Sequence, residues 1–498
     1  MNANKQLKMG AMLSYISIGI NILAGLIYTP WMIEQIGKSD YGTYTLANSL
    51  ITLFLVDFGL GAATSRYLSK YLAEGRRDLA NGFLGMVYKL YLIVDAVILL
   101  ALALVYFFLD RIYVSLTPME LERFKVVYLI AGLFAVINFP FVNLNGVLTA
   151  NEKFVQQKFA DILQRLLFVG LTTAALLAGM NVYALVMANA VSGLVVIFYR
   201  LFAIHRSTDM RADFRYREPG LYRDIFRFSF WTTVYTLAQR LIFNITPTIL
   251  GIVASSGAIA VFGVVTTIEQ NTYLITSAIN GMFMPRISRI YASNDKDADI
   301  LPLMTKVGRF QFWLNGLIVV GFAVLGRSFI GLWMGSDYAE AYLGVLLVIL
   351  PGLFYNPLQV GHTAMVVRDK VNLQAWIAIV VGVVNVACSF VLSRYYGVIG
   401  ACAAIFVANS LKAAVYHVVI HKVLKVNMFT FLKKSHLPTL PVQLLTLAAG
   451  WGINTLLPDR GWMMLGLKGM LLVGTYLVLT LPTLNKADRK GLLAFVKR

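Results

Sequence analysis

The stretch YGTYTLANSLITLFLVDFGLGAATSRY, from Tyr41 to Tyr67, decides the fold class of this chain. It is long enough to cross a bilayer, because a spanning helix needs roughly 20 mainly apolar residues. It nevertheless carries Asp57 near its middle, followed by the small residues of the segment GLGAATS. A charge inside a spanning helix is costly, so it normally faces protein or water and marks a functional pathway.

The composition extends this interpretation to the whole chain. Of 498 residues, 58% are hydrophobic and only 13% are charged, whereas soluble proteins are about 25% charged. This composition indicates an all-α polytopic membrane protein. Apolar windows separated by polar breaks predict fourteen helices, at 10–33, 43–70, 82–108, 124–149, 160–179, 182–203, 225–252, 258–283, 310–334, 342–366, 373–393, 400–421, 438–457 and 462–484.

The basic residues predict the orientation. The eight segments on the side of the N-terminus, among them 66–81, 151–165 and 200–227, carry 32 Lys and Arg residues, and the seven opposite segments carry six. Lys and Arg accumulate on the cytoplasmic side, so both termini are predicted to be cytoplasmic. The net charge of +19 is spread over all inner loops, where it meets anionic lipid headgroups. It therefore does not indicate a nucleic-acid partner.

Sequence features recur at a spacing of 217 to 221 residues. Matched pairs are Thr29-Pro30 with Thr246-Pro247, Tyr41-Gly42 with Phe262-Gly263, Pro140 with Pro357, and Lys153 with Lys370. This repeat predicts two pseudo-symmetric six-helix lobes of equal orientation, as in parallel-repeat transporters. The predicted parts are an N-terminal lobe at 1–204, a basic cytoplasmic linker at 205–224, a C-terminal lobe at 225–424, and two further helices with a cytoplasmic tail at 425–498.

The opening stretch also carries a family resemblance. The segments DYGTYTLANSL and DFGLGAATSRYLSKYLAEG, between Asp40 and Gly75, resemble the second-helix region of the polysaccharide transporters. These are bacterial flippases of the superfamily that also holds multidrug and toxin extrusion carriers and lipid II flippases. The residue motifs are Tyr41-Gly42, Asp57 to Leu60 and Arg66-Tyr67, and the arrangement of six, six and two helices fits as well.

The resemblance implies a flippase of the bacterial cytoplasmic (inner) membrane, not an enzyme, that works by alternating access. Its substrate would be an undecaprenyl-diphosphate-linked oligosaccharide for capsule, O-antigen or exopolysaccharide synthesis. Membrane lipids, a polysaccharide polymerase and glycosyltransferases are the implied partners, and no cofactor or metal is expected. Two alternatives stay open: an ion-coupled multidrug exporter of the same superfamily, and a membrane-embedded polysaccharide polymerase. The sequence does not choose the sugar, the coupling ion or the oligomeric state.

Polar stripes at helical spacing predict the substrate site. Arg240 and Lys412 are expected to bind the diphosphate, because fixed cations in a low-dielectric cavity attract anions strongly. Arg240 can do so with two parallel hydrogen bonds, and Lys412 as a point charge. Hydroxyl and amide neighbours suited to sugar are Thr236, Asn244, Asn409, Tyr416 and Asn21. A structural ion pair between Arg240 and Glu269 is the simpler alternative.

Acidic residues within spans are predicted to couple transport to an ion. These residues are Asp57, Glu269 and Asp95. They are candidates because a partly desolvated carboxylate can take up and release a proton as access alternates. Arg66, Lys89 and Arg286 lie near the predicted cytoplasmic ends and are assigned to the cytoplasmic mouth. For Lys89, a side chain that extends to the lipid headgroups is an alternative.

Overall fold

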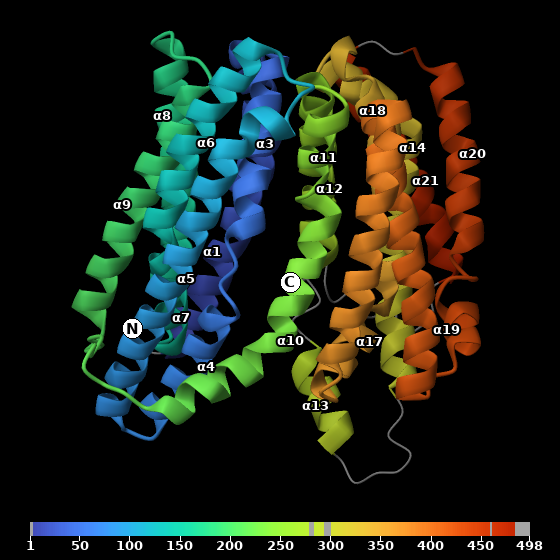
Figure 1. Cartoon of the computed structure of the whole chain (residues 1–498). Coiled ribbons are helices and arrows are strands. Elements are labelled where there is room, and N and C mark those ends of the chain that lie inside the picture. Colours follow the sequence, from blue (N-terminus) through green and yellow to red (C-terminus); the bar gives the residue numbers. More distant parts are fainter. Residues whose placement is uncertain (1–2, 278–282, 293–299, 459–460, 484–498) are drawn as a thin grey trace. The chain divides into compact units, whose positions relative to one another are not determined.

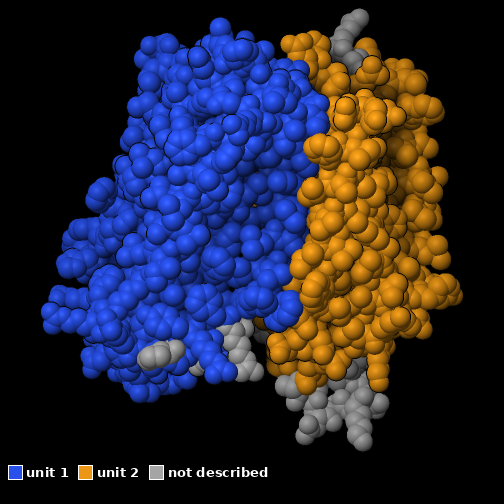
Figure 2. Space-filling model, in the orientation of Figure 1, with its two compact units in different colours: residues 1–263 blue, residues 264–498 orange. Residues whose placement is uncertain are grey.

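The computed structural model describes residues 3–277, 283–292, 300–458 and 461–483, and within these ranges every regular element is a helix (Figure 1). Packing divides the chain into two compact units, Met1–Gly263 and Val264–Arg498 (Figure 2). The predicted lobe boundary falls in the linker at 205–224 instead. Packing and sequence repetition are different criteria, so the lobe boundaries stay a prediction.

The first unit contains the elements up to the start of α12. They are α1 (Ala3–Leu23), η1 (Ala24–Tyr28), α2 (Thr29–Ile36), α3 (Lys38–Phe54), α4 (Leu60–Ala73), α5 (Arg77–Ile112), α6 (Pro118–Asn138), η2 (Phe139–Asn143), α7 (Leu144–Ala150), α8 (Phe154–Leu177), α9 (Tyr183–Ser207), α10 (Pro219–Phe243), α11 (Thr246–Val253) and α12 (Ser256–Ser277). α8 packs against both α1 and α9, and α3 packs against α6.

The second unit continues from α12. Its elements are α13 (Met284–Ala292), α14 (Leu301–Trp333), η4 (Ser336–Tyr338), α15 (Glu340–Ile349), α16 (Gly352–Tyr355), η5 (Asn356–Leu358), α17 (Gln359–Val367), α18 (Val371–Leu424), α19 (Met428–Ser435), α20 (Leu440–Leu456), α21 (Gly461–Thr480) and η6 (Leu481–Thr483). α14 contacts α15, α17, α19, α20 and α21, so it forms the centre of this unit.

Eleven helices of the described residues are long and apolar enough to cross a membrane. The other predicted spans correspond to three local features. α18 fuses the predicted helices 373–393 and 400–421 across a kink at Gly397, whose φ is 54°. The predicted helix 43–70 is broken, and α20 has only 17 residues. The chain is thus a multi-pass membrane protein, and the count of fourteen stays a prediction.

The sequence repeat coincides with repeated breaks in the helices. Thr29-Pro30 and Thr246-Pro247 each begin a new helix, α2 and α11, because proline is well accommodated in a first turn and badly in a helix interior. Pro140 and Pro357 each lie in a short 3-10 segment, η2 and η5. Matched sequence positions therefore produce matched local structure.

A second pair of matched breaks follows these prolines. Lys153 and Lys370 precede α8 and α18, and each is preceded by a residue with positive φ, Glu152 at 56° and Asp369 at 55°. A non-glycine residue in this region is uncommon. Its recurrence at the spacing of the repeat supports duplication of one ancestral half.

The last two helices are fixed to α14 by polar contacts. Gln443 of α20 donates to the Phe312 carbonyl at 3.1 Å, and the Tyr476 hydroxyl of α21 donates to the Trp313 carbonyl at 2.8 Å. Gly316 makes the first contact possible, because a Cβ there would lie 2.1 Å from the Gln443 amide nitrogen. Such hydrogen bonds hold helices together in a membrane, where water does not compete for them.

The linker between α9 and α10 is docked along α5. Asp213 donates its backbone N–H to the Asn81 carbonyl at 3.0 Å, and Lys89 donates to the Tyr216 carbonyl at 3.1 Å. Gly82 leaves room for the Tyr216 ring, because a Cβ at this position would lie 2.5 Å from the ring. The Tyr216 hydroxyl donates to Glu218, and this hydrogen bond, with burial second, raises the pKa of Tyr216 to about 12.

Candidate functional site

The second predicted span is not one continuous helix, which corrects the prediction of a helix at 43–70. α3 ends at Phe54 and α4 begins at Leu60. Between them Phe58 and Gly59 have φ of 50° and 67°, and an Asp57 carboxylate oxygen accepts the Gly59 N–H at 3.1 Å. Aspartate favours such local bonds over helix, and glycine accepts positive φ freely. The charge noted in the sequence therefore lies in an unwound segment.

Arg240 of α10 stabilises this break. Its guanidinium donates to the backbone carbonyls of Thr52 and Leu55, the latter at 2.8 Å. The last carbonyls of a helix have no partner within it, and in a membrane they need one from the protein. Asp57 is close enough for its charge to act on Arg240. Arg240 thus caps α3 next to an acidic residue, in a half-buried position.

The other predicted cation, Lys412, lies in the second unit against an aromatic ring. Lys412 of α18 is only 5% exposed, and its Nζ lies 4.1 Å from the centre of the Tyr355 ring. The His362 ring lies 4.7 Å from that of Tyr355 and 4.1 Å from that of Tyr416. These four residues form the Lys412 cluster. A desolvated ammonium over a tyrosine face gains a cation–π interaction of about 2 kcal/mol.

Two further predicted residues lie near this cluster. Glu269 of α12 is half-buried, and it is close enough for its charge and that of Lys412 to act on each other. Asn409 is half-buried on the same helix as Lys412, three residues before it, which places it on the same face. The structure therefore brings Lys412, Tyr416 and Glu269 together. His362 of this cluster was not among the residues that the sequence pointed to.

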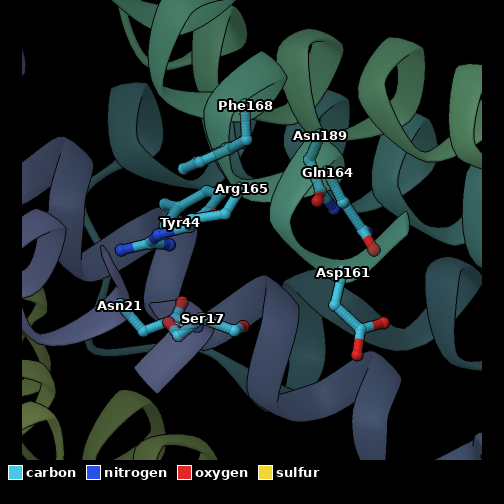
Figure 3. Close-up of a pocket in the computed structure, with 8 residues that line it drawn as sticks. All are labelled: Ser17, Asn21, Tyr44, Asp161, Gln164, Arg165, Phe168 and Asn189. Carbon is cyan, nitrogen blue, oxygen red and sulfur yellow. Dashed lines mark hydrogen bonds between the residues drawn. The ribbon is translucent and has the colours of Figure 1, made fainter. Parts of the chain in front are cut away.

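The first unit contains a polar pocket of about 450 Å³ (Figure 3). α1, α3, α8 and α9 supply its lining, which consists of Ser17, Asn21, Tyr44, Asp161, Gln164, Arg165, Phe168 and Asn189. Asn21 was predicted as a sugar-facing residue, and its amide donates to the Ser17 carbonyl at 2.9 Å. The structure thus places Asn21 in a cavity of the size that small ligands occupy, about 300–1,000 Å³.

The charged residues of this pocket were missed by sequence reasoning. Arg165 was counted with the cytoplasmic segment 151–165, but it lies in α8. Asp161, Gln164, Arg165 and Phe168 follow one another at spacings of 3, 1 and 3, which is a helical stripe. That stripe was a detectable signal. It was overlooked because the predicted cytoplasmic segment 151–165 overlapped the start of the predicted span 160–179, whereas α8 begins at Phe154.

The remaining substrate and coupling candidates are spread along several helices. Thr236 is exposed on α10 and donates to the Thr232 carbonyl of its own helix at 2.9 Å. Asn244 follows the last residue of α10 and donates its N–H to the Arg240 carbonyl at 3.0 Å. Asp95 of α5 is 9% exposed, and one carboxylate oxygen has no hydrogen-bond partner within the described ranges. Their roles stay proposals.

The residues assigned to the cytoplasmic mouth differ in their surroundings. Arg66 of α4 and Arg286 of α13 are exposed. Lys89 is half-buried and bonded to the linker through the Tyr216 carbonyl. Lys89 therefore holds the linker on α5 in this structure.

Three of the seven segments predicted to lie opposite the cytoplasmic side, 34–42, 109–125 and 253–257, meet within the first unit. Glu120 accepts hydrogen bonds from the hydroxyls of Ser39 and Ser256, each at 2.5 Å, and from the Thr117 N–H at 2.9 Å. Gly42 permits this approach, because a Cβ there would lie 2.1 Å from the Ser256 carbonyl oxygen. The glycine of the Tyr41-Gly42 motif is thus explained by packing.

Comparison with known proteins places this architecture in a family. The family model described as polysaccharide biosynthesis protein matches residues 7–291, more than half of the chain. The chain belongs to this family. A relative, the uncharacterized membrane protein EpsK of Bacillus subtilis (strain 168), is 20% identical over 414 residues, which cover 80% of this chain and 79% of EpsK.

Solved structures share the fold of this member of the polysaccharide biosynthesis family. The lipid II flippase MurJ in an inward closed conformation matches with a TM-score of 0.73 and 15% identity, over 95% of this chain and 97% of MurJ. An inward-facing multidrug resistance MATE transporter of the MOP superfamily matches with a TM-score of 0.68 and 14% identity, over 86% of this chain and all of that chain. The resemblance predicted from the motifs is thereby confirmed at the level of family and fold.

Proposed function

We propose that this protein is a flippase that moves an undecaprenyl-diphosphate-linked oligosaccharide from the inner to the outer leaflet of the bacterial cytoplasmic membrane. The product would feed capsule, O-antigen or exopolysaccharide synthesis. Family membership supports the link to polysaccharides, and the lipid II flippase MurJ shares the fold of this chain. Under this proposal both termini are cytoplasmic. Glycosyltransferases act before the flippase, and a polymerase acts after it.

The observation that carries the proposal is the placing of cations inside spanning helices. Arg240, Arg165 and Lys412 each lie within a membrane span, where a charge is expensive unless it has a use. A diphosphate that leaves the headgroup region needs fixed positive charge along its path. Arg240 would exchange one carbonyl contact for a phosphate oxygen, and Lys412 would attract the diphosphate from beneath its rings.

Ion coupling through Asp57, Glu269 or Asp95 belongs to the same proposal. Asp57 lies at the helix break beside Arg240, and Glu269 lies beside Lys412. Loss or gain of a proton at either carboxylate would change how strongly the neighbouring cation is held. The cation would then be free for the substrate in only one of the two protonation states.

The test is a flipping assay in proteoliposomes. Purified protein is reconstituted with a fluorescent undecaprenyl-diphosphate-linked oligosaccharide, and its exposure on the outer leaflet is followed by lectin capture. Protein-dependent exposure that Lys412→Met abolishes would support the proposal. The absence of exposure, combined with ion-driven efflux of a cationic dye that Glu269→Ala abolishes, would favour the multidrug exporter, the function named for the MATE match.

The polymerase alternative is tested in the same vesicles. A lipid-linked donor is supplied without any other protein, and the length of the glycan is measured. Elongation of the glycan would replace the flippase proposal with an enzymatic one. Unchanged glycan length together with flipping would support transport alone.

A further inference from the structure

We infer that the polar pocket of the first unit binds a sugar residue that carries a carboxylate, such as a uronic acid, within the transported oligosaccharide. The inference rests on the proposed function and adds the class of sugar. It starts from the charges around Arg165 and from the mixture of hydrogen-bonding groups on the pocket wall (Figure 3).

Arg165 is the cation of the pocket that no carboxylate neutralises. Its Nε is buried without a hydrogen-bond partner within the described ranges. The nearby carboxylate, Asp161, is already bound by Arg200 at 3.0 Å and by Lys158 at 3.3 Å. No acidic residue of the described chain lies within ion-pair distance of Arg165. One carboxylate thus serves two other cations, and the guanidinium charge remains available to an anionic ligand.

The rest of the lining favours carbohydrate over a diphosphate. Asn21, Gln164 and Asn189 offer both donors and acceptors, which sugar hydroxyls require because they also donate and accept. A diphosphate only accepts hydrogen bonds, so the amide oxygens would find no donor on it. The wall therefore suits a ligand that is mostly hydroxyl with one anionic group.

Aromatic rings complete the pocket. The Phe168 ring centre lies 5.9 Å from the Arg165 guanidinium carbon, and Tyr44 is close enough for an electrostatic interaction with Arg165. Figure 3 labels Arg165, Phe168 and Tyr44 among the residues that line this pocket. Flat apolar faces pack against the C–H groups of a pyranose, while a guanidinium can bind a carboxylate with two parallel hydrogen bonds. Together these groups recognise an acidic sugar.

The inference is tested with two synthetic polyprenyl-diphosphate disaccharides that differ only in carrying glucuronate or glucose. Their dissociation constants are measured on the full-length protein in lipid nanodiscs. Wild type is expected to bind the glucuronate probe roughly tenfold or more tightly, as hydrogen bonds between charged groups imply. Arg165→Gln should bring the ratio below about twofold by weakening the binding of the glucuronate probe alone. Arg165→Lys keeps the charge but loses the two parallel hydrogen bonds, so it should keep only part of the preference.

Arg206→Gln is the matched control, since Arg206 is exposed at the end of α9 in the same unit. It should leave both constants unchanged. Equal binding of the two probes by wild type would overturn the inference. An equal loss of affinity for both probes in Arg165→Gln would also overturn it. Binding that depends on glucuronate without flipping of either probe would support the pocket and refute the flippase. Flipping of both probes, with equal affinity for each, would support the flippase and refute the assignment of the pocket to an acidic sugar.

Discussion

The two cations that the sequence treats alike, Arg240 and Lys412, have different surroundings in the structure. Arg240 is half-buried and donates to two backbone carbonyls at the end of α3. Lys412 is almost fully buried and lies over the Tyr355 ring. The first cation maintains the backbone of the broken span, and the second lies over a tyrosine ring and near the charge of Glu269. Stability and transport should therefore separate between the two sites.

The largest effect is expected from Arg240→Met, which should impair stability and transport together. The substitution leaves two carbonyls without donors, and each unsatisfied buried group costs about 1–3 kcal/mol. We expect a lower midpoint of thermal unfolding in detergent and at least a tenfold loss of flipping. Arg206→Met, an exposed change in the same unit, is the control. A variant that melts and flips like wild type would remove the capping role of Arg240.

Lys412→Met is expected to abolish flipping with less damage to the fold when Glu269 is changed as well. Removing one member of a buried pair leaves an uncompensated charge, whereas replacing both members is often neutral. The free energy of unfolding of the double variant Lys412→Met/Glu269→Gln should thus lie within about 1 kcal/mol of the wild-type value, and this variant should still fail to flip the substrate. Thermal unfolding and the proteoliposome assay check both parts. A strictly additive loss of stability would show that the two charges do not interact.

The comparison also shows what could be predicted from sequence. Hydropathy, basic loops and the repeat predicted a polytopic all-α fold, and the motifs of the second span predicted the family. The break in that span could not be predicted by a hydropathy window, because Leu55, Val56 and Phe58 are as apolar as their helical neighbours. What unwinds the chain is a side-chain bond of Asp57 and two left-handed residues.

The candidate residues were predicted less completely than the fold. Helical spacing correctly places Asn409, Lys412 and Tyr416 in one helix, but it says nothing about His362 and Tyr355 from other helices. Lys468 is a similar case. A lysine near the end of a predicted span can reach the headgroups, yet Lys468 is 1% exposed. Contacts between distant segments decide such environments, and a single sequence does not contain them.

A smaller loss of stability is expected from Gly42→Ala, which tests the packing at the other end of α3. The new Cβ would lie 2.1 Å from the Ser256 carbonyl oxygen, so α3 and the start of α12 must separate and weaken the hydrogen bonds of Glu120. Overpacking of this kind typically costs about 1–3 kcal/mol. Gly19→Ala is the control, because a Cβ there meets nothing within 4 Å. Equal unfolding midpoints for the two variants would show that the close approach at Gly42 is dispensable.

The smallest effect is expected from Arg77→Ala, which removes an exposed contact between the linker and α5. Arg77 and Asp209 form an ion pair of 2.7 Å, but their side chains are 68% and 78% exposed. Exposed pairs contribute about 0–1 kcal/mol and are screened by salt. Thermal unfolding at low and high salt should therefore differ little from wild type. Lys89→Ala, which removes the half-buried bond to the Tyr216 carbonyl, should have the larger effect. A greater loss in Arg77→Ala would mean that the linker is held by charge and not by its backbone and ring contacts with α5.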